Sequence, residues 1–380
     1  MKVAVVHTLI EKAGGGERLA VSVHRALREL GHEADLYTMR LNVSAWQLLA
    51  PGEPPPRVLD IGFPLEGISR NRLTRLRRVL ALRAFMREGL PRLREEGYEL
   101  IFETQANVPS PSDAVYIHYP ALLDYMGGGG LRWAYNLAVR LAARPVLREA
   151  SRRPPRLVLT NSSWTAEKVR QAYGVEARVL YPPVDVEAIG EAARRAEKEP
   201  LVLTVSRFTP EKRLEVIPAI ARAAREMGVR AEFYIVGSTA GYSGPVIEAI
   251  RGEARRLGVD DMVHMEFNVP RGDLLKLYAR AKVYLHPPFA EHFGIAIAEG
   301  MAAGAVPVVY RDGGGWTDMA SRVDQGLGYT TPEEAARAIS WLLGSEERWS
   351  KLSAASMEVA RGFSYASFKG ALAKYLEGLK

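Results

Sequence analysis

The chain has 380 residues, of which 47% are hydrophobic and 25% charged, so it is ordinary globular material and is long enough for two domains with full cores. It contains no cysteine, which excludes disulfides, a thiolate nucleophile and a thiolate metal site, and which suits a reducing, cytoplasmic compartment. The formal net charge of +7 favours anionic partners.

The chain opens with a predicted strand, turn and helix. Residues 2–7 (KVAVVH) form a continuous apolar run typical of a buried parallel strand, and residues 19–31 (LAVSVHRALRELG) show helical spacing. Between them, AGGGER predicts a glycine-rich turn at Gly15 and Gly16. The turn lacks the G-x-G-x-x-G spacing of dinucleotide-binding folds. It is either a plain tight turn or a place where the backbone approaches a ligand or another domain.

Two arginine-rich segments follow. Residues 70–94 interleave arginines with apolar residues three to four apart, which predicts an amphipathic helix with a basic face. Such a helix can lie on an anionic membrane or form a solvated face of a soluble domain. Residues 131–147 place Trp133 and Tyr135 among arginines, which suits an interface or core packing.

No membrane-spanning segment is expected. No apolar run approaches the roughly 20 residues that span a bilayer. The start of the chain also lacks the layout of a signal peptide. We therefore expect a cytoplasmic protein that is soluble, or peripheral on the inner membrane face.

A histidine follows one of the predicted strands. ELIFET (residues 99–104) and AVYIHYP (residues 114–120) read as strands, and ligands of doubly wound sheets bind at the carboxyl ends of strands. His118 therefore lies where chemistry would occur, although a lone histidine can equally be structural. Further on, a helix is expected with its cap at Ser163. A Pro-Pro pair and a polar helical stretch mark a domain boundary near residues 183–199.

The second half opens with a new strand, LVLTVSRF. Arg207 and Lys212 fall on the loop at its carboxyl end, where two fixed cations suit a pyrophosphate: Arg through its planar fork and Lys as a point charge. Two further buried strands end near Gly237 and Asn268, and the topology places these residues beside a nucleotide.

The segment from Tyr284 to Asp318, YLHPPFAEHFGIAIAEGMAAGAVPVVYRDGGGWTD, carries the strongest chemical pattern. Glu291 lies on a loop, and Glu299 lies about one turn into the helix that follows. Backbone N–H groups at the start of this helix, near Gly294 and Ile295, can hold a phosphate. Glu299 can then accept hydrogen bonds from ribose hydroxyls, and Glu291 from the hydroxyls of a sugar.

The alternation of strands and helices indicates an α/β fold. It predicts two doubly wound parallel-sheet domains that face one another across a cleft. We expect an N-terminal acceptor-binding domain over residues 1–183, a C-terminal donor-binding domain over residues 184–362, and a C-terminal helix over residues 363–380.

Several motifs together resemble a known family. GGGER, HYP, TNSSWT, LYPPVD and EHFGIAIAEGMAAG stand in the order that they have in retaining glycosyltransferases of family 4, and the resemblance extends over essentially the whole chain. The E-x7-E spacing of Glu291 and Glu299 resembles the donor site of that family. The resemblance is closest to the α-1,2-mannosyltransferases that use GDP-mannose to extend lipid-linked oligosaccharide on the cytosolic membrane face.

The resemblance implies the GT-B fold and a retaining, metal-independent hexosyltransferase whose C-terminal helix returns to the N-terminal domain. It implies GDP-mannose as the donor, a glycan or polyprenyl-linked acceptor, an anionic membrane surface, and no nucleic acid. The implied catalytic residues are His118, which would reach the donor sugar from the acceptor side, Arg207, Lys212 and Glu291. The implied donor-binding residues are Gly15, Gly16, Gly237, Asn268, Phe293, Gly294, Ile295 and Glu299.

The sequence lacks the metal-binding motif of manganese-dependent glycosyltransferases. Manganese-dependent glycosyltransferases bridge the diphosphate with an Asp-x-Asp pair, and the sequence contains none. We therefore expect protein cations and a helix start to neutralise the leaving group.

Other functions stay open. The chain departs from the family pattern at SRF, where many members have glycine before the arginine, and at GGGWTD. A UDP-sugar-dependent glycosyltransferase, or another GT-B enzyme such as a nucleotide-sugar epimerase or a phosphorylase, is the alternative. A nucleic-acid-binding protein is a third class, for which the sequence shows no aromatic-basic motif of the known modules.

Overall fold

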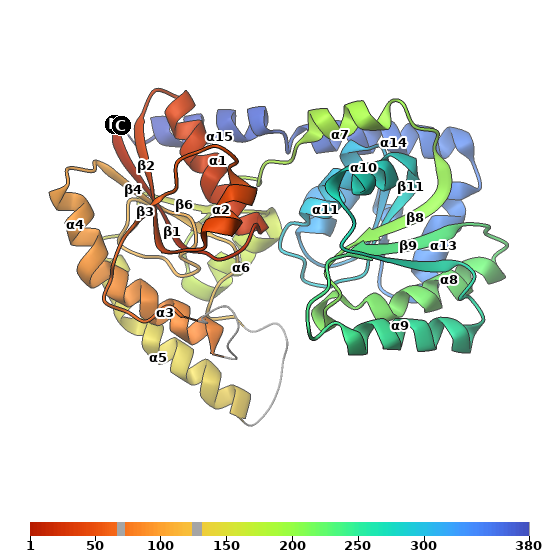
Figure 1. Ribbon diagram of the computed structural model, residues 1–380, viewed down its shortest axis with the longest axis horizontal. Helices are drawn as coiled ribbons and strands as arrows, with labels where there is room; N and C mark the ends of the chain where they lie inside the picture. The colour runs from red at the N-terminus through yellow and green to blue at the C-terminus, as the bar shows by residue number, and fades with distance from the viewer. Residues whose placement is uncertain (67–72, 124–130, 380) are drawn as a thin grey trace. The chain divides into compact units, whose positions relative to one another are not determined.

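Two parallel β-sheets organise the chain. The computed structural model describes residues 1–66, 73–123 and 131–379. The chain divides into unit 1 (Met1–Pro183 with Phe368–Lys380) and unit 2 (Val184–Ser367). Each unit contains one sheet flanked by helices (Figure 1).

In the described part of unit 1, seven strands pair in parallel in the order β3-β2-β1-β4-β5-β6-β7. Val3 to Val6 of β1 are all almost fully buried, as expected for a strand covered on both faces. The strands are β1 (Lys2–Ile10), β2 (Glu33–Leu41), β3 (Arg57–Val58), β4 (Leu100–Glu103), β5 (Ala114–Ile117), β6 (Leu157–Thr160) and β7 (Arg178–Val179).

The helices of unit 1 are α1 (Gly15–Glu29), α2 (Val43–Leu49), α3 (Thr74–Ala84), the π-helical turn η2 (Phe85–Gly89), α4 (Leu90–Glu95), α5 (Leu131–Arg152), α6 (Ser163–Tyr173) and α15 (Tyr365–Glu377). α3 and α5 run side by side (Figure 1) and bury their apolar residues against Ala4 and Val6 of β1. α15 packs within unit 1, where the Tyr375 hydroxyl donates to the carbonyl of Val179 at 2.8 Å.

Two predicted helix starts are wrong. α1 begins at Gly15, four residues earlier than the apolar periodicity indicated, so Gly15 and Gly16 lie in its first turn and not in an open turn. The Arg18 amide already donates to the Gly14 carbonyl at 3.0 Å, which closes that turn. α6 is capped by Ser162, one residue before the predicted cap, because its hydroxyl accepts from the amide of Thr165.

The arginine-rich segment over residues 70–94 is helical from Thr74 onward, as predicted, and contains a π-helical turn. Its first residues, 70–72, lie outside the described residues, and η2 joins α3 directly to α4. A Cβ on Gly89 would lie 2.6 Å from the ring of Phe85 and 2.8 Å from Leu59, so glycine lets this turn pack closely.

Two arginines of α3 bond backbone carbonyls, whereas Arg83 of the same helix is exposed. Arg75 donates to the carbonyl of Leu123 at 3.0 Å and to the side chain of Asn136. Arg77 donates to the carbonyl of Pro64 at 2.9 Å. These two guanidinium groups therefore bond backbone carbonyls of unit 1, and the membrane contact of this segment stays a prediction.

In the described residues of unit 2, six strands pair in parallel in the order β10-β9-β8-β11-β12-β13. They are β8 (Glu199–Val205), β9 (Glu232–Gly237), β10 (Val263–Phe267), β11 (Ala281–His286), β12 (Val306–Tyr310) and β13 (Gly328–Tyr329). β8 and β11 are the two central strands, so their carboxyl ends lie at the middle of the sheet edge.

The helices of unit 2 are α7 (Val186–Ala193), η3 (Pro210–Lys212), η4 (Leu214–Val216), α8 (Ile217–Glu226), α9 (Gly244–Leu257), α10 (Arg271–Arg280), α11 (Ile295–Ala302), η5 (Gly315–Ala320), α12 (Ser321–Val323), η6 (Gln325–Leu327), α13 (Pro332–Leu343) and α14 (Glu346–Arg361). α8 packs between α9 and α13, and α11 contacts α7 and α14, so helices cover both faces of the sheet (Figure 1).

The small residues of α11 let this helix approach the sheet. A Cβ on Gly300 would lie 2.7 Å from Cδ2 of Tyr284, a fully buried residue of β11. Tyr284 is fixed in turn, because its hydroxyl donates to the carbonyl of Val205 at 3.1 Å. The Tyr284 ring is therefore held in place by its burial and by this hydrogen bond.

Gly300→Ala should therefore destabilise the protein by about 1–3 kcal/mol through overpacking. Gly252→Ala is the matched control, because Gly252 lies in the exposed middle of α9 with no atom near its missing Cβ. The control should gain up to about 1 kcal/mol from helix propensity. Urea unfolding of both variants measures the difference, and equal stabilities would contradict the close packing of α11.

Candidate functional site

The backbone of Glu291 is held by the glycine run that follows β12. Glu291 forms an isolated parallel bridge with Gly313, and the amide of Gly314 donates to the Glu291 carbonyl at 2.7 Å. Gly313 has φ +95°, and a Cβ there would lie 2.5 Å from the carbonyl oxygen of Glu291. Only glycine permits this approach, so the GGG in RDGGGWTD positions Glu291.

The side chain of Glu291 is held by two more residues of unit 2. Its Oε2 lies 2.8 Å from Nζ of Lys212, at the end of η3, and 3.1 Å from Nε2 of His286, the last residue of β11. Side-chain exposure is 19% for Glu291, 20% for Lys212 and 5% for His286. The ion pair is therefore largely shielded from solvent, which strengthens it.

The charge state of this cluster follows from its surroundings. Burial alone would raise the pKa of Glu291, but the Lys212 cation and the His286 hydrogen bond hold that pKa well below its usual value. Burial lowers the pKa of His286, so its imidazole is neutral near pH 7 and donates through Nε2 to the carboxylate. The Nδ1 atom of His286 is buried and has no hydrogen-bond partner within the described residues.

Glu299 lies in a different environment on α11. Its Oε1 is 2.7 Å from a guanidinium nitrogen of Arg271, and its Oε2 accepts from the hydroxyl of Tyr278 at 2.9 Å. The carboxylate keeps further lone pairs for additional donors. The two glutamates of the E-x7-E pattern are thus oriented by separate partners.

Gly294 and Ile295 form the start of α11. Gly294 is the N-cap with φ +99°, and a Cβ on it would lie 2.6 Å from Cδ1 of Ile297. Such a helix start presents backbone N–H groups and a partial positive charge. Phe293 is 3% exposed and meets the ring of Phe363 edge-on at 5.2 Å, so it anchors this turn in the core.

Arg207, Gly237 and Asn268 follow or end three neighbouring strands, β8, β9 and β10. A Cβ on Gly237 would lie 1.6 Å from the carbonyl oxygen of Ser206, which excludes any other residue there. The Asn268 amide donates to the Gly237 carbonyl at 2.9 Å, and the Asn268 side chain bonds Thr239. Arg207 is exposed and lies 3.6 Å from Glu211. The carboxyl edge of the sheet therefore gathers the predicted residues of unit 2, with Lys212 and Glu291 in direct contact.

The predicted residues of unit 1 also come together. His118 follows β5, and its Nε2 lies 2.9 Å from the carbonyl of Thr104. A Cβ on Gly16 would lie 3.6 Å from the same nitrogen, so the first turn of α1 faces this imidazole. Gly15 precedes Gly16 in that turn.

Sequence reasoning missed two histidines. His286 ends an apolar strand and binds Glu291, and a polar residue at a strand end was the available signal. His7 ends the apolar run KVAVVH and is fully buried, with Nδ1 2.9 Å from the hydroxyl of Thr104. Burial lowers the pKa of His7 to about 3, with further lowering from His118.

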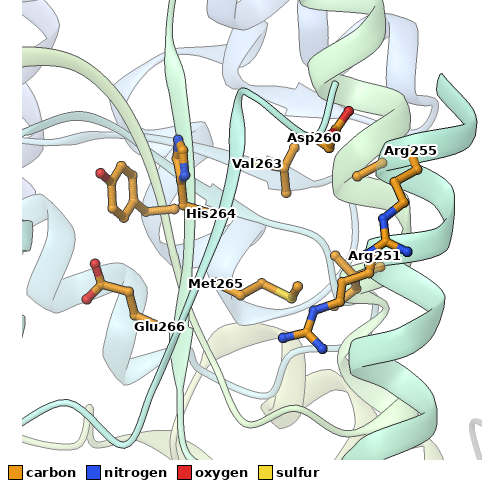
Figure 2. A pocket seen from close by; sticks show the side chains of 10 residues that line it. Arg251, Arg255, Asp260, Val263, His264, Met265 and Glu266 are labelled. Carbon is orange, nitrogen blue, oxygen red and sulfur yellow. The ribbon is translucent and has the colours of Figure 1, made fainter. Parts of the chain in front are cut away.

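A hollow of about 500 Å³ lies elsewhere in unit 2, at the edge strand β10 and α9 (Figure 2). It contains none of the predicted residues. Two of its lining side chains have acidic partners: Arg251 lies 3.0 Å from Glu248, and His264 lies 2.5 Å from Glu232. Asp260 and Glu266 also line the hollow.

In residues 1–66, 73–123 and 131–379, no group of three or more His, Asp or Glu side chains is placed to hold a metal ion. Within the same part of the chain, no helix combines the length and apolarity that crossing a bilayer requires.

Comparisons with known proteins bear on the family and the fold. Residues 185–359 match the model of the family described as "Glycosyl transferases group 1". The chain is 23% identical over 314 residues to the GDP-Man:Man(3)GlcNAc(2)-PP-Dol alpha-1,2-mannosyltransferase of Dictyostelium discoideum, covering 74% of this chain and 62% of that protein. It is 29% identical over 399 residues to the D-inositol 3-phosphate glycosyltransferase of Kribbella flavida, covering 93% and 88%.

The solved structures agree on the fold. Sucrose-phosphate synthase from Thermosynechococcus elongatus superposes with a TM-score of 0.71 at 18% identity, covering 100% of this chain and 99% of that one. The predicted GT-B fold and the resemblance to glycosyltransferases are thereby confirmed. The chain spans less than two-thirds of the first mannosyltransferases that it matches, 62% in D. discoideum and 36% in Caenorhabditis elegans.

Lys212→Met tests the charge balance at Glu291. In the native protein the pKa of Glu291 is depressed, so this carboxylate contributes stability above about pH 4.3 that is lost as the pH falls through the folded pKa. Without the lysine, burial dominates and raises the folded pKa, so the sign reverses and stability should fall as the pH rises from 5 to 7. We expect a loss of about 3 kcal/mol at pH 7 and a smaller loss at pH 5, measured by urea unfolding.

Lys276→Met is the control, because Lys276 pairs with Asp273 on the surface and is 76% exposed. It should cost less than about 1 kcal/mol at either pH. An equal loss at both pH values in Lys212→Met would show that the lysine supports packing and does not set the charge of Glu291.

Proposed function

We propose that this chain, whose residues 185–359 form a group 1 glycosyltransferase domain, moves a hexose from a nucleotide sugar to a glycan acceptor. The observation that carries the proposal is the contact of Glu291 with Lys212 and His286 beside the start of α11. It combines a fixed carboxylate for sugar hydroxyls with a fixed cation and a helix start for a diphosphate.

The donor proposed is GDP-mannose. The support is the name of the D. discoideum relative, which describes a GDP-mannose-dependent enzyme acting on a dolichol-linked glycan. The acceptor would accordingly be a lipid-linked glycan, and the protein would be cytoplasmic and peripheral on the inner membrane face.

A second candidate has its own support. The K. flavida relative, matched over 93% of this chain, is named for transfer to D-inositol 3-phosphate. A small phosphorylated acceptor, with a UDP-sugar as donor, is therefore the alternative to a lipid-linked glycan.

In the proposed reaction the bond from the sugar anomeric carbon to the phosphate oxygen breaks, and a bond to the acceptor oxygen forms on the same face. The acceptor proton passes to an oxygen of the departing phosphate. Lys212 uses one ammonium hydrogen for Glu291 and has two left for phosphate oxygens. Each such preorganised contact would contribute about 2.7–4 kcal/mol to the transition state.

Other residues are assigned roles as part of the same proposal. Glu291 accepts from the sugar, and Glu299 accepts from ribose hydroxyls through lone pairs not used by Arg271 and Tyr278. Arg207 supplies a second cation to the diphosphate, so no metal ion is required. His118 acts in the transfer step.

Transfer from radiolabelled GDP-mannose to extracted lipid-linked oligosaccharide tests the proposal, with UDP-glucose and UDP-N-acetylglucosamine as competing donors. Activity should persist in EDTA. Lys212→Ala should lower turnover by about 100-fold or more, whereas the exposed Lys276→Ala should retain wild-type turnover. Loss of transfer in EDTA with recovery on adding manganese would refute the protein-only cradle.

The roles of the two glutamates are separable. Glu299→Gln should mainly weaken binding of GDP, because it removes the charge offered to the ribose. Glu291→Gln should spare GDP binding and impair sugar transfer. Isothermal titration with GDP and a transfer assay on both variants measure this, and equal loss of GDP affinity in both would refute the division.

A further inference from the structure

The parallel sheet of unit 2 ends in an edge strand that is long for its position. β10 has five residues, whereas the other edge strands of the two described sheets, β3, β7 and β13, have two residues each. Its sequence, VHMEF, contains neither the lysine nor the proline that commonly protects a sheet edge. β10 therefore offers an open edge to another strand.

The bonds between β10 and β9 show which backbone groups of β10 point outward. The Met262 carbonyl accepts from an amide of β9 at 2.8 Å, and the Asn268 amide donates to a carbonyl of β9 at 2.9 Å. Since alternate residues of a parallel strand bond the same neighbour, Val263, Met265 and Phe267 direct their N–H and C=O groups away from β9. Among the described residues, no other segment accepts a hydrogen bond from the amides of Met265 and Phe267.

The side chains of β10 alternate between the two faces of the sheet. Figure 2 shows Met265 on the side of α9, toward Arg251, and shows His264 and Glu266 on the other side of the strand. The His264 side chain is 38% exposed, and its Nε2 lies 2.5 Å from Oε2 of Glu232. An imidazolium donates through both ring nitrogens, so Nδ1 of His264 can serve a second carboxylate.

One antiparallel register matches β10 to a second copy of itself. With Met265 opposite its own counterpart, His264 of each copy lies opposite Glu266 of the other. Val263 likewise lies opposite Phe267, and the outward backbone groups of these residues and of Met265 form the hydrogen-bonded pairs. Moving the symmetry axis to His264 or to Glu266 would instead place like residues opposite one another, which is unfavourable for charged side chains.

We propose that the chain forms a symmetric dimer in which the β10 strands of two copies pair antiparallel about Met265. The match of His264 to Glu266 within one five-residue strand favours a second copy over an unrelated partner. The hollow of about 500 Å³ beside β10, which Ile250 and Ala254 of α9 help to line, would receive apolar side chains of the second copy. The association goes beyond the proposed transfer, because it uses none of the residues assigned to that reaction.

Cysteine crosslinking tests the register, because the chain has no cysteine of its own. Residues that face each other in a hydrogen-bonded antiparallel pair have Cα atoms about 5.5 Å apart, which a disulfide can span. Met265→Cys should therefore give a covalent dimer under mild oxidation, seen on a non-reducing gel. His264→Cys and Glu266→Cys are matched controls that should stay largely monomeric on the same gel, because neither residue faces its own counterpart in this register.

Size-exclusion chromatography with light scattering tests the backbone bonds. The wild type should elute as a dimer. Met265→Pro removes the outward N–H but none of the bonds to β9, so it should raise the dissociation constant of the dimer by about 30-fold or more through the loss of two hydrogen bonds. Met265→Ala keeps that N–H and should remain dimeric. Urea unfolding shows whether the proline variant is folded, and if it is not, the cysteine variants decide.

Three results would overturn the pairing. They are a monomeric wild type, a dimer that a folded Met265→Pro variant leaves intact, and crosslinking of His264→Cys or Glu266→Cys in preference to Met265→Cys. GDP binding should be unchanged in all these variants, so failure of the dimer and failure of the proposed transfer are observed separately.

Discussion

The ion pair between Lys212 and Glu291 is the interaction on which the proposed site depends. Its partners are 79 residues apart in sequence and lie 2.8 Å from each other, with His286 completing the cluster. Burial would raise the pKa of Glu291, and the Lys212 cation outweighs this and keeps the carboxylate ionised. The pair therefore fixes a carboxylate and a cation at one edge of the sheet before any substrate arrives, which is what preorganised stabilisation requires.

Glycines make that arrangement possible. Gly313 admits the backbone of Glu291, Gly294 begins α11 in a left-handed conformation, and Gly300 lets the same helix approach Tyr284. Each of the three positions would place a Cβ within 2.7 Å of a neighbouring atom. Close packing at these glycines thus recurs along the segment that follows β11. Gly313 and Gly294 allow the backbone around Glu291 to adopt its position, and Gly300 allows α11 to pack on the sheet.

The sequence alone predicted the two parallel-sheet domains and the loop that carries Glu291, because apolar runs and glycine stops are local signals. It did not predict the role of His286, because that role depends on the contact with Glu291, which only the folded loop brings to the end of β11. It also assigned a basic face to Arg75, whose guanidinium reaches carbonyls that only the folded chain places nearby. The periodicity of apolar residues indicates which residues form a helix or strand. It does not indicate which distant residues their side chains contact.

We propose that Lys212 and the start of α11 receive the diphosphate of a nucleotide sugar. A crystal structure of the chain with GDP bound tests it most directly. We expect phosphate oxygens within hydrogen-bond distance of Nζ of Lys212 and of the backbone amides that follow Gly294, with no metal ion between them. A diphosphate bound away from Lys212, or held by a metal ion, would contradict it.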